Sequence, residues 1–395
     1  MKEAVFVSAA RTPFGKYMGS LSSQRSQDLA AKAMQEAMNR AGFDSKELDV
    51  CIFSQALQSS FPANVGRHAW LLAGLAENPA GWTANTLCAG AIQTIISGFN
   101  KIVGDYYEGI MVGGVDTYSM SQYYLFHPRY EFGPQSMYFH DPKIEVQINA
   151  QPKDIYGELT SADLACITAN NFGLNRSQLD EYTAASHEKA VNAIKAGLMQ
   201  EVITPVVKKT KKAEFTIEKD EIPKSVSVET LMGLPAVDDC CGYATEANVA
   251  PMADGAGALV MMSADKAQAL GAKPLAKMIG FGIAAGNPTL LETITARSIE
   301  KALKMAGKKL SEVDFLDIHE PSAAYALIVA DKLGEEAKGK INVDGGSLAF
   351  GHAGAATGAA MTANMIYRLQ RTGAKVGLIN VGSLGGQSLT IVIEK

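Results

Sequence analysis

The chain of 395 residues is 47% hydrophobic and 19% charged, which is enough to form two or three packed cores. Its formal net charge of −5 and its pI of about 5.8 argue against binding to nucleic acid or to an anionic membrane surface. No window approaches the roughly 18 consecutive apolar residues of a membrane span, and the first residues lack the pattern of a signal peptide. We therefore expect a globular protein of the cytoplasm.

Apolar runs and helical patterns alternate along the first 117 residues. Strands are predicted at residues 4–10, 50–56, 82–87 and 109–114, and helices near 25–41, near 64–73 and after Cys88. This alternation is typical of a mainly parallel sheet that is flanked by helices.

The same order of elements returns late in the chain. Residues 37–54, AMNRAGFDSKELDVCIFS, match residues 302–319, ALKMAGKKLSEVDFLDIH, at a shift of 265 without a gap. The segment CAGA at 88–91 matches HAGA at 352–355 at a shift of 264. Two similar α/β halves are therefore predicted. Their pseudo-twofold packing would bring the two matching turns, and so Cys88 and His352, face to face.

The pattern breaks between the halves. Residues 121–141 contain seven Phe or Tyr side chains, which are predicted either to line a substrate pocket or to pack against another subunit. A later hairpin carries a basic turn at 208–212, which is either a solvated turn or a contact for phosphate. We accordingly divide the chain into three parts. These are an N-terminal half at 1–117 completed by 251–266, an inserted loop domain at 118–250 and a C-terminal half at 267–395.

Cys88 is the strongest candidate for a catalytic residue. It lies where a predicted strand gives way to a helix that begins with small residues. A free thiol has a pKa of about 8.5, but a helix N-terminus favours the thiolate and a nearby imidazole accepts its proton. His352 lies in the Gly- and Ala-rich stretch GGSLAFGHAGAATG, which permits close approach. The pair indicates acyl-thioester chemistry.

The other cysteines have no zinc-like spacing, so we expect them to be reduced.

With these residues in view, the chain resembles the thiolase family over nearly its whole length. The segments SAARTPFGKYMGSL, NTLCAGA, ADGAGALVMMS and GGSLAFGHAGAATG follow in thiolase order. The resemblance implies a five-layered α-β-α-β-α fold and at least a homodimer, or a dimer of dimers. It also implies an acyl-CoA substrate, an acylated Cys88 and His352 as its base. Coenzyme A would be a substrate, with no permanently bound cofactor and no metal.

The sequence departs from the family at the second catalytic cysteine. Most thiolases carry it on the last glycine-rich loop, where Gly382 stands here, and some sterol-carrier-type thiolases carry it where Pro321 stands. The HEPSAA loop offers His319, which is similar to the sterol-carrier-type branch and leaves a set of Cys88, His319 and His352.

Neighbouring residues complete the predicted site. Glu320, Ser383 and Leu384 are expected to support the oxyanion or proton transfer. The segment that usually holds the pantetheine of CoA carries Ala250 and Met252. Ala250 replaces a common serine there, so we expect CoA to be held differently.

Other functions stay open. Decarboxylating condensing enzymes use one cysteine and two histidines, and a non-catalytic thiolase-like scaffold is a further alternative. The lost thiol and the many aromatic residues also resemble thiolases of anaerobic aromatic breakdown, such as those that act on benzoylsuccinyl-CoA. Related atypical thiolases work with a small zinc-ribbon/OB-fold partner subunit, so a partner of that kind is expected.

Overall fold

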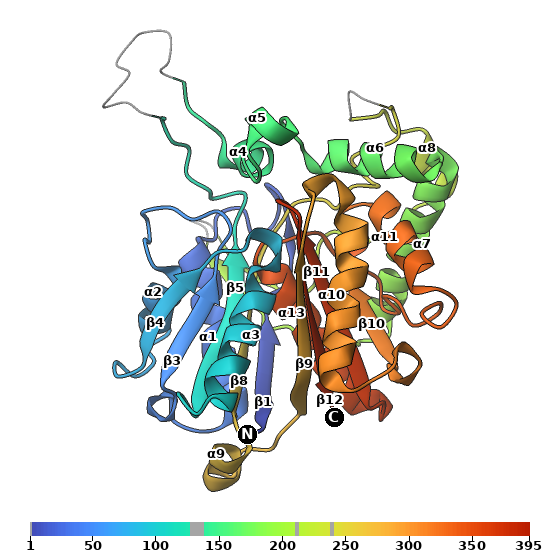
Figure 1. Ribbon diagram of the computed structural model, residues 1–395. Coiled ribbons are helices and arrows are strands. Elements are labelled where there is room, and N and C mark those ends of the chain that lie inside the picture. Colours follow the sequence, from blue (N-terminus) through green and yellow to red (C-terminus); the bar gives the residue numbers. More distant parts are fainter. Residues whose placement is uncertain (1, 127–137, 210–212, 238–240) are drawn as a thin grey trace.

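The computed structural model describes residues 2–126, 138–209, 213–237 and 241–395 (Figure 1). Its strands are β1 (Ala4–Arg11), β2 (Gly15–Lys16), β3 (Val50–Ser54), β4 (Ala80–Ala84), β5 (Gly109–Asp116), β6 (Val206–Lys209), β7 (Glu214–Ile217), β8 (Ala253–Ser263), β9 (Ala276–Ala285), β10 (Phe315–Ile318), β11 (Val376–Ser383) and β12 (Gln387–Glu394). Its α-helices are α1 (Ser26–Ala41), α2 (Val65–Leu72), α3 (Gly90–Val103), α4 (Pro142–Ile148), α5 (Lys153–Tyr156), α6 (Ser161–Phe172), α7 (Arg176–Lys195), α8 (Val228–Met232), α9 (Ala264–Leu270), α10 (Leu291–Ala306), α11 (Ala323–Leu333), α12 (Ser347–Phe350) and α13 (Ala356–Thr372).

One mixed sheet runs through the molecule in the order β10-β11-β12-β9-β1-β8-β5-β3-β4, and the short β2 pairs with β8. The sheet consists of two parts that meet where β1 pairs with β9 over only two residues, Val5 with Lys277 and Phe6 with Ala276. Within the first part β3 is parallel to β4 and β5, and within the second β10 is parallel to β11. The carboxyl ends of these parallel strands lead into the loops that carry the site.

Helices cover both parts of the sheet and also separate them. The core between the two parts includes α3 and α13, through buried side chains such as Ile92, Ile95 and Ile366. The outer face of the first part packs against α1 and α2, and that of the second part against α10 and α11. In Figure 1, α3 (cyan) and α10 (orange) both lie in front of the strands, α3 over the first part of the sheet and α10 over the second. The predicted five-layered fold is confirmed.

The internal repeat is present in the structure. The helix α10 begins and ends 265 residues after α1, and β10 begins 265 residues after β3. The predicted strands and helices of the first half are all present, with ends that shift by a few residues. The division of the chain at residues 117, 250 and 267 stays a prediction.

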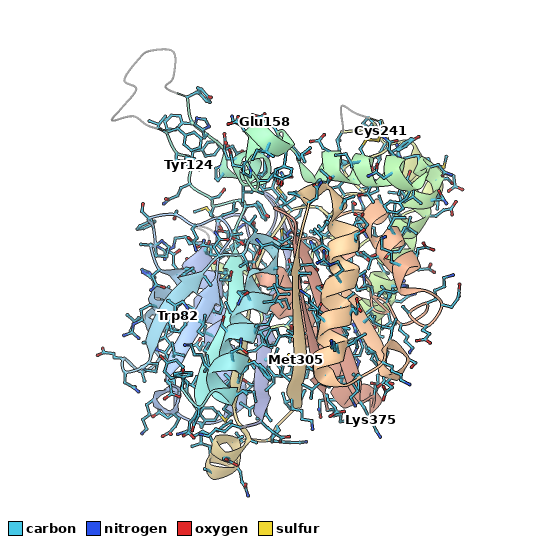
Figure 2. All side chains as sticks on the ribbon, in the orientation of Figure 1. Trp82, Tyr124, Glu158, Cys241, Met305 and Lys375 are labelled. Carbon is cyan, nitrogen blue, oxygen red and sulfur yellow. A yellow bond between two sulfur atoms is a disulfide. The ribbon has the colours of Figure 1, made fainter. Side chains whose placement is uncertain are left out.

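The segment between β5 and β8 forms α4 to α8 and the antiparallel hairpin of β6 and β7. The predicted aromatic residues Tyr130 and Phe132, and the centre of the basic turn, lie outside the described residues. The other aromatic side chains are exposed, from 37% for Tyr124 to 72% for Phe139, and Figure 2 shows Tyr124 at the margin of the molecule. None of these described side chains reaches the cavity around Cys88.

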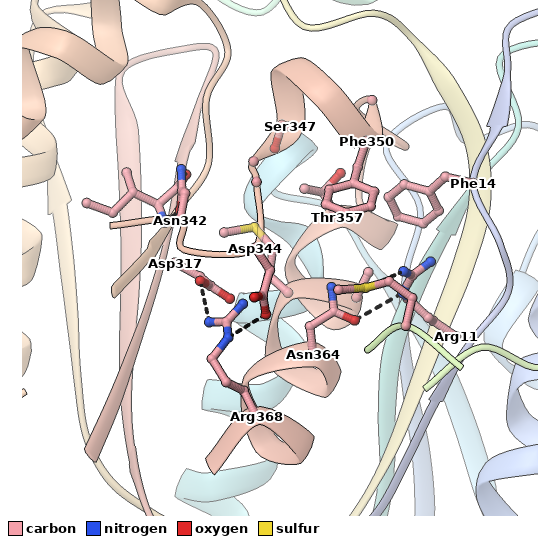
Figure 3. A pocket seen from close by; sticks show the side chains of 17 residues that line it. Arg11, Phe14, Asp317, Asn342, Asp344, Ser347, Phe350, Thr357, Asn364 and Arg368 are labelled. Carbon is pink, nitrogen blue, oxygen red and sulfur yellow. Dashed lines mark hydrogen bonds and ion pairs between the residues drawn. The ribbon is translucent and has the colours of Figure 1, made fainter. Parts of the chain in front are cut away.

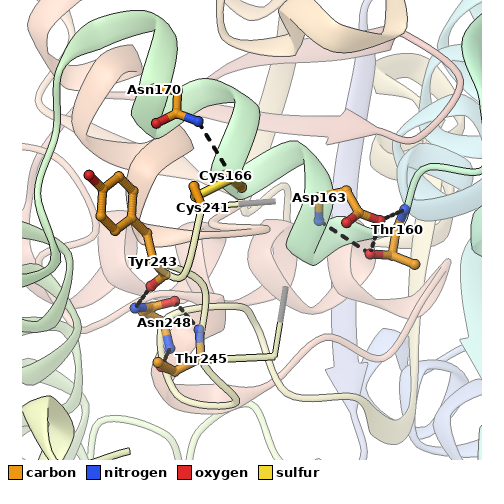
Figure 4. Close-up of a disulfide and its surroundings, with 8 residues drawn as sticks. All are labelled: Thr160, Asp163, Cys166, Asn170, Cys241, Tyr243, Thr245 and Asn248. Carbon is orange, nitrogen blue, oxygen red and sulfur yellow. Dashed lines mark hydrogen bonds between the residues drawn. A yellow bond between two sulfur atoms is a disulfide. The ribbon is translucent and has the colours of Figure 1, made fainter. Parts of the chain in front are cut away.

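A disulfide joins Cys166 on α6 to Cys241 (Figure 4). The expectation that these cysteines are reduced is therefore wrong. Their Cα atoms lie 5.9 Å apart, which is a normal distance for a disulfide, but the 75 residues between them hide this proximity in the sequence. The bond ties α6, which forms one wall of the cavity around Cys88, to the loop that leads toward Ala250. Across the described residues, every helix is too short or too polar to cross a membrane.

Candidate active site

The chain around Cys88 changes abruptly from strand to helix. β4 ends at Ala84, a single 3-10 turn spans Leu87–Ala89, and α3 follows at once. Leu87 has a φ of +50°, which is unusual for a residue with a side chain and marks backbone strain next to the thiol. Any side chain at Gly90 would put its Cβ 1.9 Å from the Ser54 hydroxyl, so only glycine permits the first helical turn to lie this close to β3.

His352 lies on the loop between α12 and α13, the counterpart of the Cys88 turn. Its backbone N–H donates to the carbonyl of Pro251 at 2.8 Å, and its own carbonyl accepts from Ala253 at 3.0 Å. Its Nδ1 lies 2.8 Å from the Thr357 hydroxyl on the first turn of α13. The backbone bonds fix the loop and the Thr357 hydroxyl fixes the ring, which leaves Nε2 for chemistry.

His319 reaches the same place from the end of β10. Its backbone N–H donates to the carbonyl of Asn380 on β11, and its Nδ1 lies 2.7 Å from the Ser347 hydroxyl. The Nε2 atoms of His319 and His352 are both buried without a hydrogen-bond partner in the described structure. Because buried polar atoms are normally paired, two such atoms side by side indicate a place for a ligand.

Burial keeps both imidazoles neutral. It lowers the pKa of His352 to about 4, and it lowers the pKa of His319 further below its usual range, with His352 adding to the effect. A neutral imidazole is able to accept a proton at Nε2 or to donate one from it, depending on its tautomer. The two rings therefore supply an acid–base pair of groups at pH 7 without carrying charge.

Cys88, His319 and His352 meet at one cavity of about 570 Å³. The predicted residues Ala250 and Leu384 also line it, as do Pro321 and Gly382, the two positions that the resemblance to thiolases assigns to a second cysteine. The remaining lining residues are Ser161, Leu164, Thr168, Pro288, Thr289, Leu291, Ser322 and Tyr325. A second cavity of about 810 Å³ shares Cys88, Ala250 and His352 with the first and adds the predicted Met252.

The thiol of Cys88 is less acidic than the sequence suggests. Burial raises the pKa of Cys88 to about 11, although the backbone N–H of Leu384 and the Ser383 hydroxyl act in the opposite direction. The backbone N–H of Cys88 itself favours the thiolate, as expected at a helix N-terminus, but burial outweighs this effect. Ser383 and Leu384 do lie beside the sulfur, where the sequence predicted supporting groups.

Two family models match consecutive parts of the chain. The thiolase N-terminal domain matches residues 4–265, and the thiolase C-terminal domain matches residues 272–395. The chain belongs to the thiolase family. It is thus an enzyme of this family, and the family and fold suggested by its motifs are confirmed.

Relatives of this thiolase align over its full length. It is 32% identical to the acetyl-CoA acetyltransferase of Escherichia coli, with 100% of both chains covered. It is 30% identical to the mitochondrial 3-ketoacyl-CoA thiolase of Mus musculus, with 100% of this chain and 98% of the relative covered. The crystal structure of the Bacillus anthracis acetyl-CoA acetyltransferase superposes with a TM-score of 0.95 at 31% identity, covering 100% of this chain and 99% of the other. The human mitochondrial 3-ketoacyl-CoA thiolase in complex with CoA gives 0.92 at 27% identity, covering 100% and 98%.

Glu320 does not line the cavity of this thiolase, although the sequence suggested a role at the oxyanion or in proton transfer. Its carboxylate points the other way and accepts hydrogen bonds from Tyr182 at 2.9 Å and Ser186 at 3.0 Å, both on α7. It also accepts from the Asn342 amide at 2.6 Å and the Leu348 N–H at 3.2 Å. Glu320 thus anchors the loop that carries His319.

Asp116, which the sequence analysis did not single out, joins the two halves at the site. Its buried carboxylate accepts from the backbone N–H groups of Ala56, Leu57 and Ala355, the last at 2.6 Å. Burial raises its pKa to about 7. A lone charged residue that ends the apolar strand GIMVGGVD is the signal that identifies such an anchor.

A separate cavity of about 500 Å³ lies beside the side chains that hold the two histidines (Figure 3). Ser347 and Thr357, the partners of the two Nδ1 atoms, form part of its wall. Opposite them, the buried Arg368 pairs with Asp317 at 2.7 Å and with Asp344 at 2.8 Å. Arg371 also pairs with Asp344 at 2.8 Å, so two cations balance two carboxylates, and the cavity belongs to the frame that supports the histidines.

Proposed function

We propose that this thiolase cleaves a 3-oxoacyl-CoA with free CoA, or runs the reverse condensation, through an acyl thioester on Cys88. One observation carries the proposal. A partly buried thiol and two unpartnered imidazole Nε2 atoms share a single cavity. A thioester intermediate requires a nucleophile, a base for its proton and a donor for the developing oxyanion, and the three side chains match those requirements.

His352 is the base in this mechanism. Its loop is the structural counterpart of the Cys88 turn, and its Nδ1 is held by Thr357 so that Nε2 is free. Burial raises the pKa of the thiol and lowers that of His352, which favours the neutral forms of both groups. The proton therefore moves to His352 as the sulfur attacks the carbonyl. His319 donates from Nε2 to the oxygen on which negative charge develops.

CoA is a substrate in this proposal rather than a resident cofactor. The second cavity, next to Cys88, is open toward Ala250 and Met252 and offers a route for the pantetheine arm. The relative that has been solved with CoA supports this assignment. Ala250 offers no hydroxyl, so we expect the arm to be held by backbone groups and by the cavity wall.

The acyl group is proposed to be larger than acetyl, and an aromatic group as in benzoylsuccinyl-CoA remains in the proposal. The apolar wall formed by Leu164, Leu291 and Pro321 supports a large acyl group. The aromatic residues at 123–139 lend no support, because those in the described structure are exposed.

A decarboxylating condensing enzyme is the second candidate, since one cysteine and two histidines without a second thiol also suit that reaction. A non-catalytic scaffold is disfavoured by the complete set of three side chains.

Exposed apolar side chains support the expected protein partners. β4 is an edge strand of the sheet, and its Trp82 is 37% exposed, which supports pairing with a second copy in a homodimer or a dimer of dimers. The exposed Tyr123 and Phe139 offer a further apolar surface, either for such packing or for a small zinc-ribbon/OB-fold subunit. A cytoplasmic location remains part of the proposal.

A panel of CoA esters tests the function. The purified chain is incubated with acetoacetyl-CoA, 3-oxohexanoyl-CoA, 3-oxo-3-phenylpropanoyl-CoA and benzoylsuccinyl-CoA, with and without CoA, and with malonyl-CoA alone. We expect CoA-dependent cleavage of at least one 3-oxo ester. The ratio of kcat/KM between fitting and poorly fitting acyl groups should correspond to roughly 1–3 kcal/mol in transition-state free energy. Decarboxylation of malonyl-CoA without any thiolysis would favour the condensing enzyme instead. A clear preference for acetoacetyl-CoA would exclude the larger acyl group.

A further inference from the structure

The proposed cleavage needs a proton that Cys88 and the two histidines do not readily supply. When the carbon–carbon bond breaks, its electron pair stays on the α-carbon of the departing thioester as an enolate, which must be protonated. At that moment Cys88 is acylated, His352 holds the proton from the thiol, and His319 faces the oxygen of the carbonyl that Cys88 attacked. A further acid beside the cavity would complete the reaction.

Tyr325 is the remaining titratable side chain that lines the 570 Å³ cavity. It lies on the first turn of α11, directly after the HEPSAA loop, and is 3% exposed. Its phenol oxygen also lies beside Gly382. A Cβ atom built on Gly382 would be 2.6 Å from that oxygen and 3.2 Å from Cζ. The tyrosine hydroxyl therefore fills the space that a side chain at position 382 would enter.

We propose that Tyr325 is the acid and base of the carbon–carbon step, in place of a second thiol; this inference rests on the proposed function. The phenol O–H bond breaks, and its proton forms the new C–H bond at the α-carbon of the enolate. The resulting phenolate takes the proton of the incoming CoA thiol, and the CoA thiolate attacks acyl-Cys88. Cys88 leaves as a thiolate and regains its proton from His352. Each group ends the cycle in its starting state.

The surroundings of the phenol suit this role. The Thr295 hydroxyl lies 2.6 Å from the phenol oxygen, and either group is able to donate. Thr295 also contacts the Ser388 hydroxyl at 3.0 Å, at the start of a buried row of hydroxyls. When the phenol gives up its proton, Thr295 is able to turn its hydrogen toward the phenolate and stabilise it. Burial raises the pKa of Tyr325, so the side chain carries its proton in the resting enzyme.

Tyr325→Phe tests the inference because it removes one hydroxyl and keeps the ring. The substrate is the 3-oxo ester of the panel that the wild type cleaves fastest, and two steps are measured separately. Acylation of Cys88 by the acyl-CoA product is followed by mass spectrometry. The carbon–carbon step is followed by cleavage and by exchange of the α-protons of the thioester product in D₂O. Tyr367→Phe is the matched control, since that hydroxyl bonds to the Ala9 carbonyl away from the cavity.

We expect Tyr325→Phe to slow cleavage and α-proton exchange by about 10²-fold or more. Acylation should stay within about tenfold, because a CoA thiolate leaves without an acid. Cleavage by Tyr325→Phe at nearly the wild-type rate would overturn the inference. Equal losses in acylation and α-proton exchange would also overturn it, since they would indicate a merely structural hydroxyl. A wild type that forms no acyl-Cys88 with any ester would instead contradict the proposed function itself.

Discussion

The imidazole rings of His319 and His352 lie with their centroids 4.3 Å apart and their planes tilted by 33°. His319 lies at the end of β10 and His352 lies on the loop between α12 and α13, yet both rings are held in the same way. A hydroxyl holds Nδ1, Ser347 for one ring and Thr357 for the other, and Nε2 is left unpaired. Two buried hydrogen bonds therefore orient the two neutral rings toward the same place.

Replacing His319 by alanine should slow every step in which Cys88 attacks a carbonyl. If Nε2 of His319 stabilises the developing oxyanion, His319→Ala should slow carbon–carbon cleavage by about 10²-fold or more. Acylation of Cys88 by the acyl-CoA product passes through an oxyanion on the same carbon, so it should slow as well. Single-turnover measurements follow each of the two reactions. Equal rates for the variant and the wild type would remove His319 from the mechanism.

Replacing Glu320 by glutamine should loosen the loop that carries His319. The carboxylate accepts four hydrogen bonds, and an amide of the same shape would turn its N–H groups toward donors such as Tyr182 and Asn342. We expect a loss of about 1–3 kcal/mol in the free energy of unfolding, measured in urea. The matched control is Glu335→Gln, because that carboxylate is exposed. A Glu320→Gln variant as stable as the control would contradict the anchoring role.

His187 should make the fold less stable in mild acid. His187 on α7 is buried without a partner for Nδ1, and burial, helped by the Lys224 cation, lowers its pKa to about 4. Below its usual pKa of about 6.5, the unfolded chain binds a proton that the folded chain does not, so stability is lost as the pH falls from about 6.5 toward 4. Urea titrations at several pH values measure this loss. His187→Gln should make the dependence on pH shallower, and an unchanged slope would exclude His187 as a source.

The sequence predicted those parts of the site that depend on the repeat. Cys88 and His352 occupy matching turns, so their meeting follows from the pseudo-symmetry of two α/β halves. Local sequence carries no such signal for Ser347 and Tyr325, whose roles arise because loops distant in the chain converge. The same reason hides the bond between Cys166 and Cys241. The direction of the Glu320 side chain depends on packing against α7, which no motif specifies.

The acidity of Cys88 illustrates why the local argument fails quantitatively. A helix N-terminus favours a thiolate, and the sequence indicated such a position correctly. However, residues of the inserted segment and the loop at Leu384 partly bury Cys88, and the cost of removing a charge from water exceeds the help from nearby N–H groups. Burial is a tertiary property, so it becomes known only with the fold.

The central claim is that Cys88 carries the acyl group. The most direct measurement is peptide mass spectrometry of the protein after incubation with the panel of 3-oxoacyl-CoA esters in the absence of free CoA. The account predicts an acyl adduct on Cys88 that disappears when CoA is added, and no adduct in Cys88→Ser, whose hydroxyl is too weak a nucleophile for His352 to activate. An adduct on another cysteine with Cys88 unmodified, or full turnover by Cys88→Ser, would contradict it.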